Sequence, residues 1–75
     1  MEKEAIEFFM SIHRLCAIEE YGEKAIVVIN EGEAGEYENN PTIIEYEAKG
    51  YHFVDANMFG HDTEILESLT FIPIE

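Results

Sequence analysis

The spacing of apolar residues changes abruptly at Gly22, and this change constrains the fold more than any other feature of the chain. Over residues 2–21 the apolar side chains recur at the i, i+3, i+4, i+7 intervals of an amphipathic helix. Residues 25–30 then form the β-branched run AIVVIN, which is short, almost wholly apolar and typical of a central strand. A helix followed directly by such a strand predicts an α+β fold.

The predicted helix has one continuous apolar stripe, and Gly22 is a natural residue to end it. The stripe consists of Ala5, Phe8, Phe9, Ile12, Leu15 and Cys16. We expect this stripe to pack on the sheet, with Cys16 as a buried structural thiol. If the stripe is wider than the sheet can cover, Phe8 and Ile18 would support a homodimer seam.

Two further runs are predicted to be extended, and a short turn joins them. Residues 42–48 and 51–57 flank Lys49-Gly50, and two residues ending in Gly between β-rich runs indicate a hairpin. In that hairpin Tyr46 would face Phe53 across the two strands.

The rest of the chain is less determined by its pattern. Residues 36–38 fit either a strand or a loop, and residues 58–63 are predicted to be a loop around Gly60. Residues 65–69 fit a short helix starting at Asp62 or Thr63, and residues 69–74 fit a strand. The overall prediction is one domain over residues 1–75, with an N-terminal amphipathic helix packed on an antiparallel sheet of three to four strands.

The charge of the chain is strongly negative, which restricts its partners. Seventeen acidic residues stand against four basic ones, and the formal net charge is −13. A polyanion of this kind is not expected to bind nucleic acid or anionic membranes directly. Its field favours basic proteins or cations. The hydrophobic content of 47% argues against a disordered acidic tail and for a folded domain.

An acidic segment between residues 25 and 48 contains six Glu and neither Lys nor Arg. Neighbouring Glu are spaced i, i+2, which on an extended strand places carboxylates on one face about 6.7 Å apart. Such a row would imitate a nucleic-acid backbone, with two tyrosines as flanking contacts. A solvated face that only keeps the protein soluble is the alternative interpretation. The predicted partner-binding residues are Glu31, Glu33, Glu36, Tyr37, Glu38, Glu45, Tyr46 and Glu47.

The sequence offers no arrangement of residues that indicates catalysis, and we expect the protein not to be an enzyme. No Ser/His/Asp pattern and no phosphate-binding Gly loop is apparent, and Cys16 lies in a negative surround that disfavours a thiolate. Asp55, His61, Asp62 and Glu64 have ligand types that suit a divalent cation, but they lack a recognised spacing. We therefore predict no metal and no cofactor, with a cation-binding module as a third alternative function.

In size and acidity the chain is similar to phage-encoded DNA-mimic inhibitors, including anti-CRISPR and anti-restriction proteins, and to the immunity proteins of nuclease toxins. The likeness is one of composition and carries no residue roles. It implies a stoichiometric inhibitor of a basic nucleic-acid-binding protein or nuclease. The alternative is a small accessory or assembly subunit that binds through an apolar patch such as Met58-Phe59. A single cysteine and the lack of an apolar run predict a cytoplasmic protein.

Overall fold

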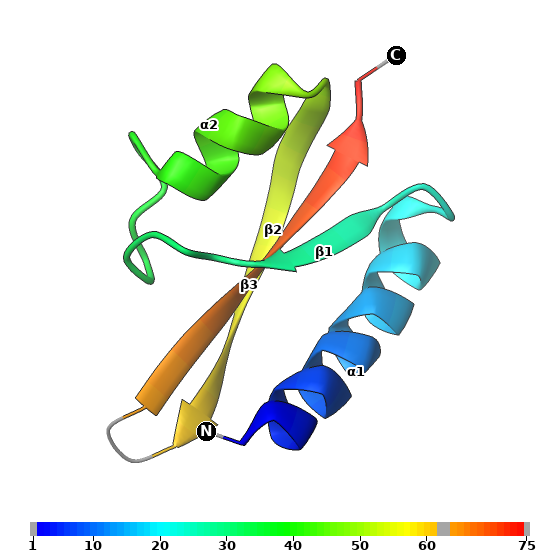
Figure 1. Ribbon diagram of the computed structural model, residues 1–75. Coiled ribbons are helices and arrows are strands. Elements are labelled where there is room, and N and C mark those ends of the chain that lie inside the picture. Colours follow the sequence, from blue (N-terminus) through cyan, green and yellow to red (C-terminus); the bar gives the residue numbers. More distant parts are fainter. Residues whose placement is uncertain (1, 62–63, 75) are drawn as a thin grey trace.

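The computed structural model describes residues 2–61 and 64–74, and Figure 1 shows its elements in the order α1, β1, α2, β2, β3. α1 spans Lys3–Tyr21, and the amide of Gly22 closes it by donating to the Ile18 carbonyl oxygen at 3.0 Å. β1 spans Ile26–Ile29. The predicted N-terminal helix, the strand after it and the α+β fold with an antiparallel sheet are confirmed.

The last strand of the described chain is the centre of the sheet. β2 spans Tyr51–His61 and β3 spans Glu64–Pro73, and the strand order is β1-β3-β2 with both pairs antiparallel. The register between β2 and β3 shifts after Phe53, where a bulge lets the strand bend. The β2–β3 ribbon extends beyond the short β1, as its lower end in Figure 1 shows.

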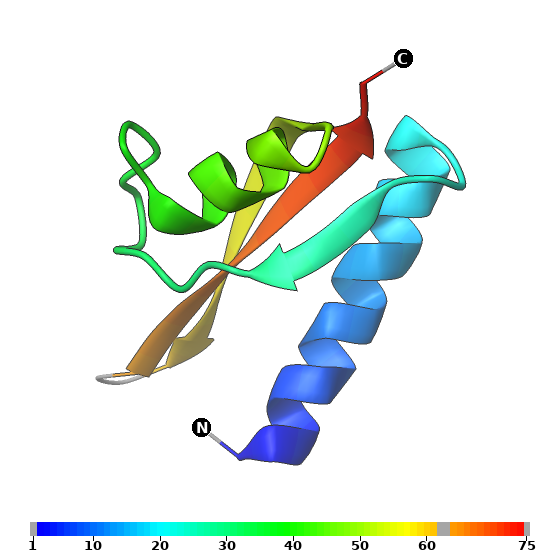
Figure 2. The ribbon, with the colours of Figure 1, turned by 45° about the horizontal axis from the view of Figure 1, so that its top comes forward.

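Alternation along β3 gives the sheet two apolar faces, because successive side chains of a strand point to opposite sides. On one face Ala17 of α1 packs with Val27 of β1, and Ile72 of β3 adds to this cluster. On the other face Ile43 packs with Leu69 and Phe71, both of which have no exposed surface. The two helices therefore lie on opposite faces of one thin sheet, as Figure 2 also shows.

The predicted strand over residues 42–48 is wrong, because this segment is the helix α2, Pro41–Ala48. Asn40 caps the helix: its Oδ1 accepts from the amides of Thr42 and Ile43 at 2.9 and 3.2 Å. A proline at the first helical position suits the start of a helix, where no amide donor is needed. Gly50, at a φ of 94°, follows the helix and turns the chain into β2.

This correction removes the predicted hairpin around Lys49-Gly50. The partner of Phe53 in the sheet is Phe71 of β3, not Tyr46. Tyr46 still reaches the same core, because its ring stacks on Phe71 with the centroids 5.0 Å apart. The aromatic cluster that the sequence placed between two strands is thus built between a helix and a strand.

The C-terminal prediction also changes. Residues 64–69 belong to β3 and not to a short helix, and residues 58–61 belong to β2 and not to a loop. The proposed start of that helix, Asp62 or Thr63, lies outside the described residues. The strand predicted over residues 69–74 is present as the second half of β3.

α1 turns a different face to the sheet from the one predicted. The inner face is formed by Ile6, Met10, His13 and Ala17, all of which are buried or half-buried. The predicted stripe, including Cys16, is largely exposed. Apolar residues occupy both faces of this helix, so their periodicity alone could not select the packed one. In the described part of the chain, neither helix is long and apolar enough to cross a membrane.

Candidate functional site

All six glutamates of the acidic segment are exposed, but they do not form the predicted row on a strand. Four of them lie in the loop between β1 and α2, and two lie on α2. Residues 36–38, left open by the sequence, are loop. We call this loop, residues 30–40, the acidic loop. Its carboxylates are those of Glu31, Glu33, Glu36 and Glu38.

The acidic loop is built around the buried carboxylate of Glu67 in β3, which is only 2% exposed. Its Oε1 accepts from Nδ2 of Asn30 at 2.7 Å and from the amide of Gly35 at 3.3 Å. Its Oε2 accepts from the hydroxyl of Tyr37 at 2.6 Å. Hydrogen bonds to an ionised acceptor are stronger than neutral ones, so Glu67 ties both halves of the loop to the central strand.

Asn40 links the same loop to α2. Its Nδ2 donates to Oδ1 of Asn30 at 3.0 Å and to the carbonyl oxygen of Glu36 at 2.7 Å, while its Oδ1 caps the helix. The amide of Glu31 donates to the hydroxyl of Thr42 at 2.9 Å. Among the described residues, no buried polar side-chain atom lacks a hydrogen-bond partner. A satisfied buried network of this kind fixes the backbone that carries the exposed carboxylates.

The two glutamates of α2 are separated from each other. Residues two apart on a helix do not face each other, so the i, i+2 spacing of Glu45 and Glu47 does not make a pair. Glu45 Oε2 accepts from Nζ of Lys49 at 3.0 Å, and the same ammonium lies 4.8 Å from the ring centroid of Tyr46. The hydrogen bond and charge of Glu45 raise the pKa of Lys49. Of the two, Glu45 is therefore partly neutralised.

The two predicted tyrosines have different surroundings. Tyr37 is 39% exposed, and its ring lies 5.2 Å from that of Phe53. Its hydrogen bond to Glu67 raises the pKa of the Tyr37 phenol, with burial and nearby carboxylates adding to the effect. Tyr46 is half-buried in the core against Phe71. Tyr37 thus offers one side of its ring at the acidic loop, whereas Tyr46 has mainly a structural place.

The apolar pair Met58-Phe59, predicted as an alternative contact site, is divided between the two faces of the sheet. Met58 is 55% exposed, and Phe59 is only 8% exposed. The Phe59 ring packs 5.4 Å from the rings of both Phe9 and His13. Only Met58 remains available as a surface contact.

His13 is the titratable group that joins α1 to the sheet. Its Nδ1 lies 2.8 Å from the hydroxyl of Ser68, and burial lowers the pKa of the imidazole. Because the folded state disfavours the proton, the contribution of neutral His13 to the stability of the fold is complete above the unfolded pKa of about 6.5. It is lost as the pH falls through the lower pKa of the folded state.

We expect acidification from about pH 7.5 to about pH 5.5 to lower the free energy of unfolding less in His13→Gln than in the wild type. Urea denaturation at the two pH values measures this difference. His52→Gln is the control, because it removes an imidazole that is exposed on β2 instead of one packed between α1 and the sheet. Equal dependence in wild type and His13→Gln would show that burial of His13 does not couple to folding.

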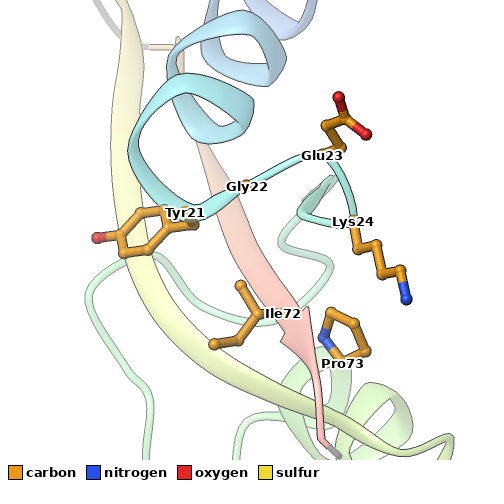
Figure 3. Close-up of a pocket in the computed structure, with 6 residues that line it drawn as sticks. All are labelled: Tyr21, Gly22, Glu23, Lys24, Ile72 and Pro73. Carbon is orange, nitrogen blue, oxygen red and sulfur yellow. The ribbon is translucent and has the colours of Figure 1, made fainter.

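A hollow of about 640 Å³ lies at the end of α1, where the chain turns towards β1. Figure 3 shows Tyr21 and Pro73 on opposite sides of Ile72, with Glu23 and Lys24 at the turn. Burial raises the pKa of Tyr21, and the charges of Asp55 and Glu20 raise it further. With one acid and one base, the hollow shares none of the charge character of the acidic loop.

The cation-binding set considered from the sequence is not fully described. Asp62 lies outside the described residues, as does the side chain of His61. Within residues 2–61 and 64–74, no group of three or more His, Cys, Asp or Glu side chains is placed to hold a metal ion.

Comparison of the chain with protein-family models, with curated proteins and with solved structures found no match. The acidic loop and the network beneath it are therefore the features from which a function is argued. The sequence pattern found the exposed carboxylates but not Glu67, Asn30 and Asn40, which hold them. Asn40-Pro41 is a recognisable helix start, whereas a buried Glu in a strand that also holds Ser68 and Thr70 has no distinguishing signal.

Proposed function

We propose that the protein is a stoichiometric inhibitor whose acidic loop occupies the phosphate-binding groove of a basic nucleic-acid-binding protein or nuclease. One observation carries the proposal: four exposed glutamates lie on a loop that a buried network holds to the sheet and to α2. A loop backbone that is already held in place in the free protein loses little conformational entropy on binding. A solvated surface that served only solubility would not need such a network.

The charges around the acidic loop support the same proposal. Between Ala25 and Ala48 there is no basic residue, so within this segment no cation competes with the arginines and lysines of a partner for the acidic loop. Glu47 is exposed on α2 and adds to the loop, while the ion pair with Lys49 reduces the contribution of Glu45. The exposed part of the Tyr37 ring can stack on an arginine guanidinium. We place this activity in the cytoplasm, where a basic nucleic-acid enzyme would be met.

The test begins with capture of the partner from host lysate and elution with increasing salt. Attraction between a polyanion and a basic groove gives fast association that salt weakens. Nucleic acid and the inhibitor should exclude each other from the captured protein, because they use one groove. A partner that binds nucleic acid and this chain simultaneously would contradict the proposal. Retention through high salt would favour the accessory-subunit alternative, for which exposed Met58 is the candidate contact.

We expect the combined change of Glu31, Glu33, Glu36 and Glu38 to Lys to weaken partner binding at least about 100-fold, or about 2.7 kcal/mol. The control reverses four exposed glutamates elsewhere, namely Glu4, Glu19, Glu20 and Glu23. Each reversal adds two charges, so both variants change from −13 to −5. Calorimetric titration of the partner, after circular dichroism has shown that both variants fold, measures the difference. Equal loss in both would show that net charge matters and that the acidic loop does not.

A further inference from the structure

α1 carries a second apolar stripe on the side that faces away from the sheet. Ala5, Phe8, Ile12 and Leu15 follow one another at intervals of three, four and three residues. These are the intervals of a coiled-coil seam, in which two helices pack side by side. The residues that pack on the sheet belong to a separate stripe of the same helix, as described above. One face of α1 is thus covered by the sheet, and the seam is left open to solvent.

The open stripe is large for so small a protein. Phe8 is 63% exposed, Leu15 is 68% exposed, and Phe9 and Ile12 add to the same surface. Together these four side chains expose roughly 400 Å² of apolar surface. Buried on both copies, this is roughly 800 Å² in total, which is below the about 1,200 Å² of a standard stable interface and fits a weak, concentration-dependent contact. α1 stands alone on its side of the sheet in Figure 2, with no other element over its outer face.

The distribution of charge decides which partner fits this stripe. Between Ala5 and Ile18 the chain has one acid, Glu7, and one formal base, Arg14, so the net charge of −13 lies entirely outside this segment. A basic partner would find no excess of carboxylates here. A second copy, in contrast, would meet a surface on which two such anionic chains do not bring an excess of carboxylates together. The complementary surface for this stripe is therefore the stripe itself.

We propose that two copies of the protein associate through the outer face of α1, with the two helices antiparallel. In this arrangement Phe8 of each copy packs against Ile12 of the other, and Ala5 packs against Leu15. Glu7 and Arg14 both lie to the side of this seam that is turned away from the second copy, so the contact itself is apolar. A parallel pair would place like charges at the same level. The antiparallel dimer leaves both acidic loops on the outside, where each remains free to bind.

This dimer has a salt dependence opposite to that of the proposed inhibitory contact. Two copies with a net charge of −13 each repel one another at long range. The Debye length falls from about 8 Å at 0.15 M salt to about 3 Å at 1 M salt, which removes most of that repulsion. The apolar contacts of the dimer do not depend on attraction between opposite charges, so salt does not weaken them. Salt should therefore strengthen self-association while it weakens binding to a basic partner.

Analytical ultracentrifugation of the full chain at about 0.15 M and about 1 M salt tests the proposal. The variant Phe8→Gln with Leu15→Gln removes apolar surface from the stripe. Its control, Ile44→Gln with Ile65→Gln, makes the same change at two exposed isoleucines on α2 and β3. All four side chains are more than half exposed, so both variants should fold.

We expect the wild type and the control to approach twice the 8.6 kDa mass of one chain at high salt, with at least about 10-fold tighter association than at low salt. The Phe8→Gln, Leu15→Gln variant should remain a monomer at both salt concentrations. A wild type that stays monomeric at high salt and about 1 mM protein would overturn the proposal. Equal loss of association in both variants, or association that salt weakens, would also overturn it. None of these three results would bear on the acidic loop.

Discussion

Replacing Glu67 with alanine is expected to lower the free energy of unfolding by about 3–4 kcal/mol. The substitution leaves the Asn30 amide and the Tyr37 hydroxyl without the acceptor that they share in the folded protein. Each unsatisfied group costs about 1–3 kcal/mol, part of which is offset because a buried charge is also removed. Urea denaturation followed by circular dichroism measures the change.

Glu67→Gln separates the charge from the shape of this side chain. The amide keeps one acceptor oxygen for Asn30, so we expect a loss of only about 1–2 kcal/mol. Hydrogen exchange at Gly35, whose amide donates to Glu67, reports on the acidic loop itself and should be faster in Glu67→Ala. If the alanine variant does not fold, Tyr37→Phe removes a single hydrogen bond and serves in its place. Unchanged exchange at Gly35 in a destabilised variant would show that Glu67 stabilises the sheet without holding the loop.

Replacing Phe71 with alanine is expected to lower the free energy of unfolding by about 3–5 kcal/mol. The Phe71 side chain has no exposed surface. The centroid of its ring lies 5.0 Å from that of Tyr46 and 5.8 Å from that of Phe53. The substitution loses the transfer free energy of a phenyl group and leaves a cavity between α2 and the sheet. A chain of 75 residues has a total stability of roughly 4–11 kcal/mol, so this loss is a large part of it.

Two further variants make the Phe71 measurement interpretable. Phe71→Leu keeps most of the volume and should cost less than about 1.5–2 kcal/mol, which gives a folded protein if the alanine variant is unfolded. Phe8→Ala makes the same chemical change on the exposed face of α1 and should stay within about 0.5 kcal/mol of the wild type. A comparable loss in Phe8→Ala and Phe71→Ala would mean that α2 does not cover a tightly packed core.

The elements with a single dominant signal were predictable from the sequence. α1 ends at Gly22, a residue type that commonly ends helices, and β1 is an unbroken β-branched run. α2 is not predictable from its residues 42–48 because they also fit an extended run, although Asn40-Pro41 just before them is a recognisable helix start. Its capping hydrogen bonds outweigh the β propensity of two isoleucines and a threonine, which local propensity alone does not reveal.

The candidate site was predictable in composition but not in geometry. The number of glutamates in the segment predicts that they are exposed, because carboxylates without a cation partner stay in solvent. Their arrangement depends on Glu67, which is more than 25 residues away in sequence and reaches the loop only once the sheet has formed. The exposed stripe on α1 was mistaken for the packed one, since two apolar faces on one helix have the same period.

The central place of β3 has a consequence for how the chain folds. β1 and β2 do not pair with each other in the described structure, and each depends on β3, which follows both in the chain. Residue 29 pairs with residue 68, so this part of the sheet closes only across a long intervening segment. Formation of the β2–β3 hairpin is a local event, while docking of β1 is a slower non-local one. A chain emerging from the ribosome therefore holds α1 and β1 without a sheet until β3 has been synthesised.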